Sequence, residues 1–462
     1  MKKQDGIQTM CGEMKPAYEK LPAYDTYYGA LETEYRQSVE EGLDIELYAD
    51  VFASAAKLPQ GEVKKKIGDA LFEAVSSAKT RIGYAYVEPS EYEKIIKLRK
   101  GDFSFIRKPN SASLADKIYG AWTGRICGCM LGKSIEGIKS DELVPLLKET
   151  GNYPMRRYIK RSDLSQEIYA KYKYGLKERV YIDETDGMPA DDDTNYVVMA
   201  QAVVERFGRD FTPYDIAVAW QESQPRNAYY TAEQVAYRNF ANGYFPPDCA
   251  KFQNPYREWI GAQIRGDYYG YINPGDPQAA AGMAFRDASV SHTKNGIYGE
   301  MFVSAMIAAA AVENDISAII EKGLAQIPHT SRLHEAVSGV LDGYRKGVSC
   351  KAVFDGIHSS YDEHTLHGWC HVIPNAMIVC ASLLYGGGDF GKSICLAVET
   401  AFDTDCNGAT VGSVLGMRGG YSAVGEEWKA PLGDKLHTEF VKTPCVSVRE
   451  CVQKTLEHIS RG

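Results

Sequence analysis

The residues best suited to chemistry are three adjacent carboxylates in the middle of the chain, Asp191, Asp192 and Asp193, followed by Thr194. Directly after them, apolar residues recur at the spacing of one helix face: Tyr196, Met199, Ala200, Val203 and Phe207. One Asp, or Thr194, suffices to cap the first backbone N–H groups of such a helix. The surplus carboxylates are oxygen ligands of the kind that bind a hard cation such as Mg²⁺. An over-acidic helix cap is the alternative interpretation.

A second acidic segment lies late in the chain, where Asp403 and Asp405 alternate with Thr404 and precede Cys406. Apolar residues at helical spacing come before it: Phe390, Ile394, Ala397, Val398 and Ala401. The two carboxylates therefore stand between two predicted helices. They are either further cation ligands or part of a solvated turn.

Two glycine stripes are expected to join these segments. Glycine recurs every four residues at Gly120, Gly124, Gly128 and Gly132, and again at Gly408, Gly412 and Gly416. Each glycine inside a helix costs roughly 1 kcal/mol relative to alanine, so the stripes predict two helices whose backbones pack closely. Such packing brings Glu136, just after the first stripe, near Asp403 and Asp405. Carboxylates from three remote segments meet at low cost only with a cation between them.

The chain from about residue 114 to residue 460 resembles the ADP-ribosylglycohydrolase family, which includes the enzyme that reactivates nitrogenase reductase. That family has an all-helical fold and a two-magnesium centre with three ligand segments. The matching residues are Glu136 in the first segment, Asp191, Asp192, Asp193 and Thr194 in the second, and Asp403, Asp405 and Cys406 in the third. Three further residues resemble the substrate side of the family's site: Ser291, His292 and Gly296.

The chain departs from the family pattern at three positions. Asp191 stands where the pattern has Thr or Ser, Cys406 where it has Thr, and Cys129 where it commonly has Asp. A thiol is a poor ligand for Mg²⁺. This favours an arrangement in which Cys406 has left the ligand set and Asp191 compensates for it.

The resemblance implies hydrolysis at the anomeric carbon of an ADP-ribosyl group on a protein or a small molecule, with two Mg²⁺ ions, or Mn²⁺ in their place. Glu136 and Asp193 are the candidates for positioning or deprotonating the attacking water. The remaining metal ligands would be Asp191, Asp192, Asp403 and Asp405, with Cys406 at the third segment. An N-ribosyl hydrolase of a nucleoside-like metabolite and a non-catalytic binding or structural protein are the alternatives.

Two other clusters allow a function. Residues 265–276 read as a loop rich in glycine and tyrosine, in which Tyr268, Tyr269 or Tyr271 offers a face for stacking a base. His364, His367 and His371 with Cys370 resemble zinc ligands. A partnered cysteine pair and a His-Glu-x-x-His motif are both missing, which disfavours zinc.

The composition fits a globular protein of two or three domains, with 462 residues, 44% hydrophobic and 24% charged. We expect an all-α fold, with an N-terminal helical extension over residues 1–110 and an ADP-ribosylglycohydrolase-like domain over 111–462. A net charge of −9 without a basic cluster argues against a nucleic-acid partner. The most apolar segment, Met301–Val312, is too short to span a membrane. No signal peptide is recognised and the eleven cysteines are scattered, so the expected location is the cytoplasm. The sequence leaves the oligomeric state open.

Overall fold

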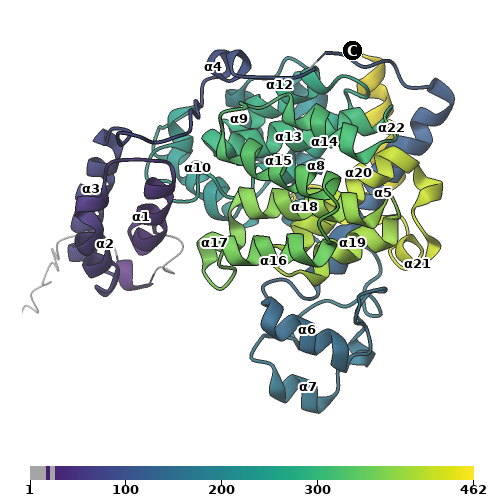
Figure 1. The fold of residues 1–462 in the computed structure, drawn as a ribbon, viewed down its shortest axis with the longest axis horizontal. Coiled ribbons are helices and arrows are strands. Elements are labelled where there is room, and N and C mark those ends of the chain that lie inside the picture. Colours follow the sequence, from purple (N-terminus) through teal and green to yellow (C-terminus); the bar gives the residue numbers. More distant parts are fainter. Residues whose placement is uncertain (1–16, 21–25, 103, 462) are drawn as a thin grey trace, which may run out of the picture. The chain divides into compact units, whose positions relative to one another are not determined.

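Figure 1 shows the computed structural model of the chain, which describes residues 17–20, 26–102 and 104–461. The first residues, for which the sequence predicts no signal peptide, lie outside this part. The chain is about 62% helical, so the predicted all-α fold is confirmed. Its two short strands, β1 (Lys435–His437) and β2 (Cys445–Ser447), pair antiparallel.

The chain forms two compact units, residues 1–84 and residues 85–462. In the first unit the helices are α1 (Leu31–Glu40), α2 (Ala49–Ala56) and α3 (Glu62–Ser77). Their buried faces share a small apolar core of Leu31, Phe52, Ala55, Leu71 and Phe72. The helical character expected for the N-terminal region is therefore present. The predicted domain division at residue 110 stays a prediction.

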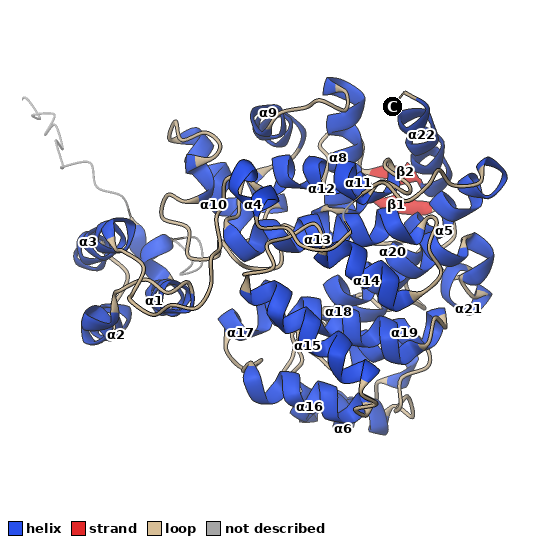
Figure 2. Cartoon of the chain, turned by 45° about the horizontal axis from the view of Figure 1, so that its top comes forward, coloured by secondary structure: helices blue, strands red, loops and turns tan. Residues whose placement is uncertain are grey.

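The second unit holds the remaining helices (Figure 2). Up to the middle of the chain they are α4 (Tyr92–Lys97), α5 (Ser111–Lys133), α6 (Ser140–Glu149), α7 (Gln166–Lys171), α8 (Asp192–Phe207), α9 (Pro213–Ser223), α10 (Thr231–Ala241) and α11 (Asp267–Tyr271). Then follow α12 (Pro277–Ala288), α13 (Lys294–Ala310), α14 (Ile316–Leu324), α15 (Arg332–Arg345), α16 (Cys350–Ser360) and α17 (Leu366–Cys370). The last are α18 (Val372–Gly386), α19 (Phe390–Glu399), α20 (Thr404–Gly419), α21 (Glu426–Lys429) and α22 (Val448–Ser460).

The centre of this unit is built from α13, α5 and α20, which lie side by side (Figures 1 and 2). Every residue of α13 from Asn295 to Ala310 is buried, which agrees with a helix that is apolar on nearly all sides. α5 and α20 are buried over most of their lengths although both are rich in glycine. Because the interface of α5 and α20 contains so little side-chain volume, contacts between the two backbones fix where the ends of these helices lie.

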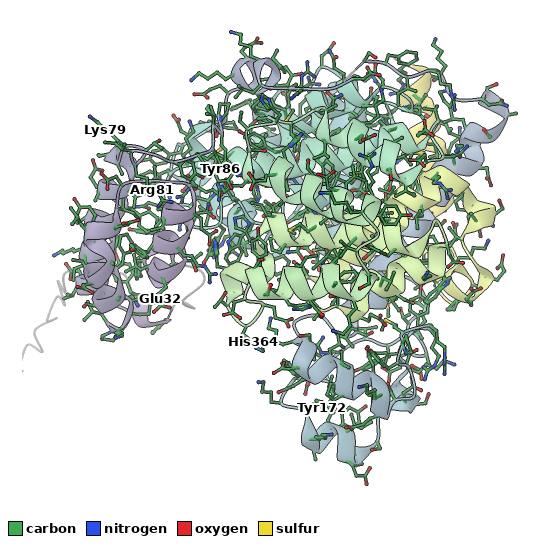
Figure 3. The ribbon with its side chains drawn as sticks, viewed as in Figure 1. Glu32, Lys79, Arg81, Tyr86, Tyr172 and His364 are labelled. Carbon is green, nitrogen blue, oxygen red and sulfur yellow. The ribbon has the colours of Figure 1, made fainter. Side chains whose placement is uncertain are left out.

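One segment differs in structure from the prediction made from its sequence. Residues 265–276 were predicted to be a loop, but they begin at the end of a 3₁₀ turn (Gln263–Arg265) and continue into α11, whose residues are buried. Elsewhere in this unit, α6 and α7 project from the helical body (Figure 1). Tyr172, labelled in Figure 3, links the two helices because its hydroxyl donates to Glu149 at 3.2 Å.

No helix in the described part of the chain has both the length and the hydropathy needed to cross a membrane. The cysteines of the described part are all free thiols, and most of them are buried.

Candidate metal centre

A cavity of about 400 Å³ lies where α5 ends and where α8 and α20 begin. Its wall contains residues from all three acidic segments: Glu136, Asp191, Asp192, Asp403, Asp405 and Cys406. A larger cavity, of about 830 Å³, lies among α6, α16 and α19 and contains none of these residues. The chemistry of its wall makes the smaller cavity, called the acidic pocket below, the candidate site.

The glycine stripes bring the ends of this site together, as the sequence predicts. α5 and α20 pack so closely that a Cβ added to Gly128 would stand 1.9 Å from the carbonyl oxygen of Gly408. Equivalent contacts join Gly120 to Gly416 and Gly124 to Gly412. At the end of the pair, Thr404 Oγ1 donates to the carbonyl oxygen of Gly132 at 3.0 Å. The chain leaving α5 therefore carries Glu136 to the start of α20.

The direction of Asp403 is set by two residues with left-handed backbone conformation. Ala401 has φ of 65° and Phe402 has φ of 59°, and neither side chain has exposed surface. Such conformations cost roughly 1–3 kcal/mol per non-glycine residue. The Trp369 indole N–H donates to the carbonyl oxygen of Phe402 and helps to hold this turn. The surrounding core thus keeps a strained connection between α19 and α20 in place.

The potential ligand atoms form three groups whose members lie within 4.8 Å of one another: Glu136 with Asp403 and Asp405, Asp193 with Asp405 and Cys406, and Cys129 with Asp191 and Asp193. Asp193 Oδ2 and Asp405 Oδ1 are buried without a hydrogen-bond partner among the described residues. These two unpaired oxygens lie on neighbouring carboxylates of one ligand group, so both are available to a partner bound between them. A donor set of several carboxylates fits a divalent cation.

Burial beside other carboxylates also raises the pKa values of several of these groups. Burial raises the pKa of Asp403 to about 7, and the negative charge of Glu136 adds to the rise. Burial also raises the pKa values of Asp192 and Asp405 well above their usual range, with neighbouring carboxylates as the second cause. The site without a cation therefore favours protonated carboxyl groups, and a bound cation would remove this repulsion.

Asp191 has a different environment from the other carboxylates. Its Oδ1 accepts the backbone N–H of Asp193 at 3.0 Å and so caps α8, while Lys133 Nζ donates to its Oδ2 at 2.6 Å. Burial alone would raise its pKa, but Lys133 and these hydrogen bonds hold the pKa below its usual value. Asp191 therefore caps α8, as the helix-cap interpretation predicts, and it also lines the acidic pocket, as the metal-site interpretation predicts.

Arg125 belongs to the site, but the sequence alone did not reveal it. It is 1% exposed and donates to the backbone carbonyl and Oδ1 of Asp193 at 2.7 and 2.9 Å. It also donates to Asp267 Oδ1 at 2.8 Å and to the carbonyl oxygen of Ile264 at 2.7 Å. Burial raises the pKa of Asp193 well above its usual value, and Arg125 offsets part of the rise. Arg125 therefore ties the start of α8 to α5.

The residues predicted for the substrate side lie one layer behind the pocket. Arg265 donates to the Glu233 carboxylate and to Ser291 Oγ, and Ser291 Oγ lies 2.8 Å from His292 Nδ1. Burial, and then the charge of Arg265, lowers the pKa of His292 well below its usual value, so the ring is neutral. Gly296 is buried in α13. Among these five residues, Glu233 alone lines the pocket, and Arg265 connects it to Ser291.

The three tyrosines predicted to stack on a base do not reach the pocket. Tyr268, Tyr269 and Tyr271 have no exposed surface. Their hydroxyl groups are paired with His458, Asp287 and Ser413. A ring without exposed surface offers no face to a ligand. The aromatic side chains that line the pocket are Tyr230, Trp259 and Trp369, which come from three separate segments that the sequence did not connect.

The histidine cluster does not form one metal site among the described residues. His364 and Cys370 share no group of potential ligands with His367 and His371. The His364 side chain is 56% exposed. His367 Nδ1 accepts the indole N–H of Trp259 at 3.1 Å. The zinc interpretation, already disfavoured by the sequence, gains no support from this arrangement.

Comparison with protein families decides the relationship of the chain. The model of the ADP-ribosylglycohydrolase family matches residues 110–455. The chain belongs to this family. An ADP-ribosylglycohydrolase-related protein complex is among the similar solved structures, at a TM-score of 0.47 and 18% identity, covering 76% of this chain and 99% of that chain. No match was found among curated proteins.

The match to the ADP-ribosylglycohydrolase family contains all three acidic segments and the glycine-striped helices α5 and α20. Family membership supports a hydrolase acting on glycosidic bonds. The first unit, residues 1–84, lies outside the match.

Proposed function

We propose that this ADP-ribosylglycohydrolase family member is a metal-dependent hydrolase that cleaves the bond at the anomeric carbon of an ADP-ribosyl group carried by a protein or a small molecule. The observation that supports this most is the convergence of three remote acidic segments at one cavity, with Asp193 Oδ2 and Asp405 Oδ1 buried and without a partner. A helix cap would need one carboxylate and would satisfy it. This arrangement instead has the donor atoms of a divalent-cation site.

Different residues of the site would have different roles in such a hydrolysis. Cleavage builds positive charge on the ribose while water attacks its opposite face. A divalent ion, Mg²⁺ or Mn²⁺, would polarise the ribose hydroxyl groups and lower the pKa of a bound water. Glu136 lines the pocket, and burial followed by the charge of Asp191 raises its pKa, which makes it the stronger candidate for accepting a proton from water. Asp193, held by Arg125, positions the start of α8.

The test is a hydrolysis assay on full-length protein with and without metal. Peptides carrying ADP-ribose on Arg or on Ser are incubated with protein treated with EDTA, and then with added Mg²⁺ or Mn²⁺. We expect ADP-ribose to be released only in the presence of metal, and the release to be lost in Glu136→Gln. Full activity of the metal-free protein would contradict the proposal.

A second candidate function is hydrolysis of an N-ribosyl bond in a nucleoside-like metabolite. The observation that favours it is the charge of the wall. Among the described residues lining the pocket, Lys133 is the one cationic side chain, and it is paired with Asp191. Glu233 and Glu439 add negative charge to the same wall. Such a wall favours a substrate without a diphosphate, because no cationic side chain is left to pair with it.

The same assay separates the two candidates. Nucleosides and ADP-ribosylated peptides are offered in parallel, and released ribose and ADP-ribose are measured by chromatography. Release of ribose from a nucleoside without release of ADP-ribose from the peptides would establish the second function.

A further inference from the structure

The acidic pocket contains a sulfur atom among its oxygen ligands. Cys406 lies in the first turn of α20, is 5% exposed and lines the pocket. Its Sγ lies within 4.8 Å of a carboxylate oxygen of Asp193 and of Asp405. In the family pattern this position is a threonine, whose hydroxyl is a hard oxygen ligand. A thiol at this position is a softer potential ligand than a hydroxyl, while the carboxylates of the other segments still match the family pattern.

The two carboxylates beside Cys406 independently offer oxygen atoms to a cation. Asp193 is 0% exposed and Asp405 3% exposed, and each has one oxygen without a hydrogen-bond partner among the described residues. Leaving such atoms unpaired in a buried site is costly, and a cation bound between them removes the cost. Sγ of Cys406 stands close to both of these residues. A cation that reaches the two carboxylates also comes within reach of the sulfur.

The structure also speaks against the arrangement expected from the sequence, in which Asp191 replaces Cys406 as a ligand. Both oxygens of Asp191 already accept a hydrogen bond, one from the backbone N–H of Asp193 and one from Lys133. Each oxygen of Asp191 would therefore have to share its remaining lone pair with a cation while it keeps the helix cap or the ion pair. The Cys406 thiol is instead within hydrogen-bonding reach of Asp193 and Asp403, which are themselves candidate ligands of the cation.

We propose that Cys406 binds the cation through its thiolate and that the site therefore selects a thiophilic divalent transition-metal ion, of the class of Fe²⁺, Co²⁺ and Zn²⁺, over Mg²⁺. As the sulfur–metal bond forms, the S–H bond breaks and its proton passes to solvent. A thiolate favours these ions because it is a soft ligand, whereas Mg²⁺ takes oxygen ligands. The inference rests on the metal site of the proposed function, but not on its substrate.

The pocket offers a matched control for this thiol. Cys370, in α17, also lines the pocket and is 6% exposed, but it belongs to no group of potential ligands among the described residues. Cys370→Ser and Cys406→Thr thus change one buried pocket thiol each. Thermal melts of both variants establish that they fold.

The first measurement is a Co²⁺ titration of full-length protein freed of metal with a chelator, followed by absorption spectroscopy. We expect a thiolate-to-cobalt charge-transfer band in the near ultraviolet for the wild type and for Cys370→Ser. The band should be missing in Cys406→Thr, while the weaker visible cobalt bands show that Co²⁺ is still bound. Visible bands without the charge-transfer band in the wild type would overturn the proposal, as would a charge-transfer band that survives in Cys406→Thr.

The second measurement is the affinity for Co²⁺ and for Mg²⁺ by calorimetry. Most protein sites bind Co²⁺ more tightly than Mg²⁺, so the informative quantity is the change in the ratio of the two affinities on substitution. We expect this ratio to fall about 10- to 100-fold in Cys406→Thr. It should stay unchanged in Cys370→Ser, and an equal ratio in wild type and Cys406→Thr would overturn the proposal. A wild type that binds neither ion would instead contradict the metal site of the proposed function.

Discussion

The backbones of Gly132 and Asp405 are in direct contact, although the two residues are far apart in the chain. Thr404, the residue before Asp405, follows Gly132 by 272 positions and donates a hydrogen bond to its carbonyl oxygen. A Cβ added to Gly132 would stand 2.3 Å from the backbone nitrogen of Asp405. The contact closes the glycine-lined interface of α5 and α20 at the end where the acidic pocket lies. The geometry of the carboxylates therefore depends on a helix interface that contains almost no side chains.

The first prediction concerns this interface. Gly128→Ala should lower the free energy of unfolding by about 3 kcal/mol or more, because the new Cβ would stand 1.9 Å from the carbonyl oxygen of Gly408. Gly339→Ala is the control, because Gly339 lies inside α15 with no atom within 4 Å of a new Cβ. The control should raise stability by about 0.5–1 kcal/mol. Urea unfolding followed by circular dichroism measures both, and equal effects would refute the role of the close contact.

The meeting of the remote acidic segments was predictable from the sequence, because the glycine stripes indicate that the helices next to them pack closely. Glycine spaced by four residues has a physical cost that only close helix packing offsets. The two stripes therefore predicted that the helices before Glu136 and around Asp405 meet, and the structure places both residues in one pocket. The all-α fold followed from the family resemblance.

The partners of the carboxylates were not predictable, because they depend on which remote residues meet in space. Arg125 lies in a glycine-rich helix, and nothing in its sequence neighbourhood shows that it pairs with Asp193 and Asp267. The left-handed conformation of Phe402 was hidden for a related reason. Left-handed conformations are usually marked by glycine, and here the tertiary structure imposes one on a bulky residue.

The second prediction concerns pH. In the folded metal-free protein the pKa of Asp403 is about 7, against 3.8 for an ordinary Asp. Between these values the folded state binds more protons than the unfolded state, so this group lowers stability as pH rises from about 4 to about 7. Melting temperatures with EDTA should fall along this range more steeply than those of Asp403→Asn. Added Mn²⁺ should flatten the wild-type profile, and identical profiles for both proteins in EDTA would contradict the explanation.

The third prediction separates function from stability at one carboxylate. Asp405→Asn should reduce metal affinity or turnover at least about 100-fold, since even the outer partners of metal ligands typically contribute 10- to 100-fold. The metal-free variant should melt at a higher temperature than the metal-free wild type, because one of several mutually repelling buried carboxylates is gone. Calorimetry with Mn²⁺ and thermal melts in EDTA measure the two effects. Wild-type metal affinity would remove Asp405 from the site.

The last prediction concerns Arg125, whose guanidinium pairs with Asp193 and Asp267 in the core. Arg125→Gln should lower the free energy of unfolding by about 3–5 kcal/mol, because it leaves two buried carboxylates without their cation. Arg345→Gln is the matched control, since Arg345 pairs with Glu321 while both side chains are about half exposed. That change should cost about 0–1 kcal/mol. Mn²⁺ should recover part of the loss in Arg125→Gln by binding at Asp193, but it should leave the difference between Arg345→Gln and wild type unchanged. A loss in Arg125→Gln no larger than that of the control would show that the buried pairs contribute little.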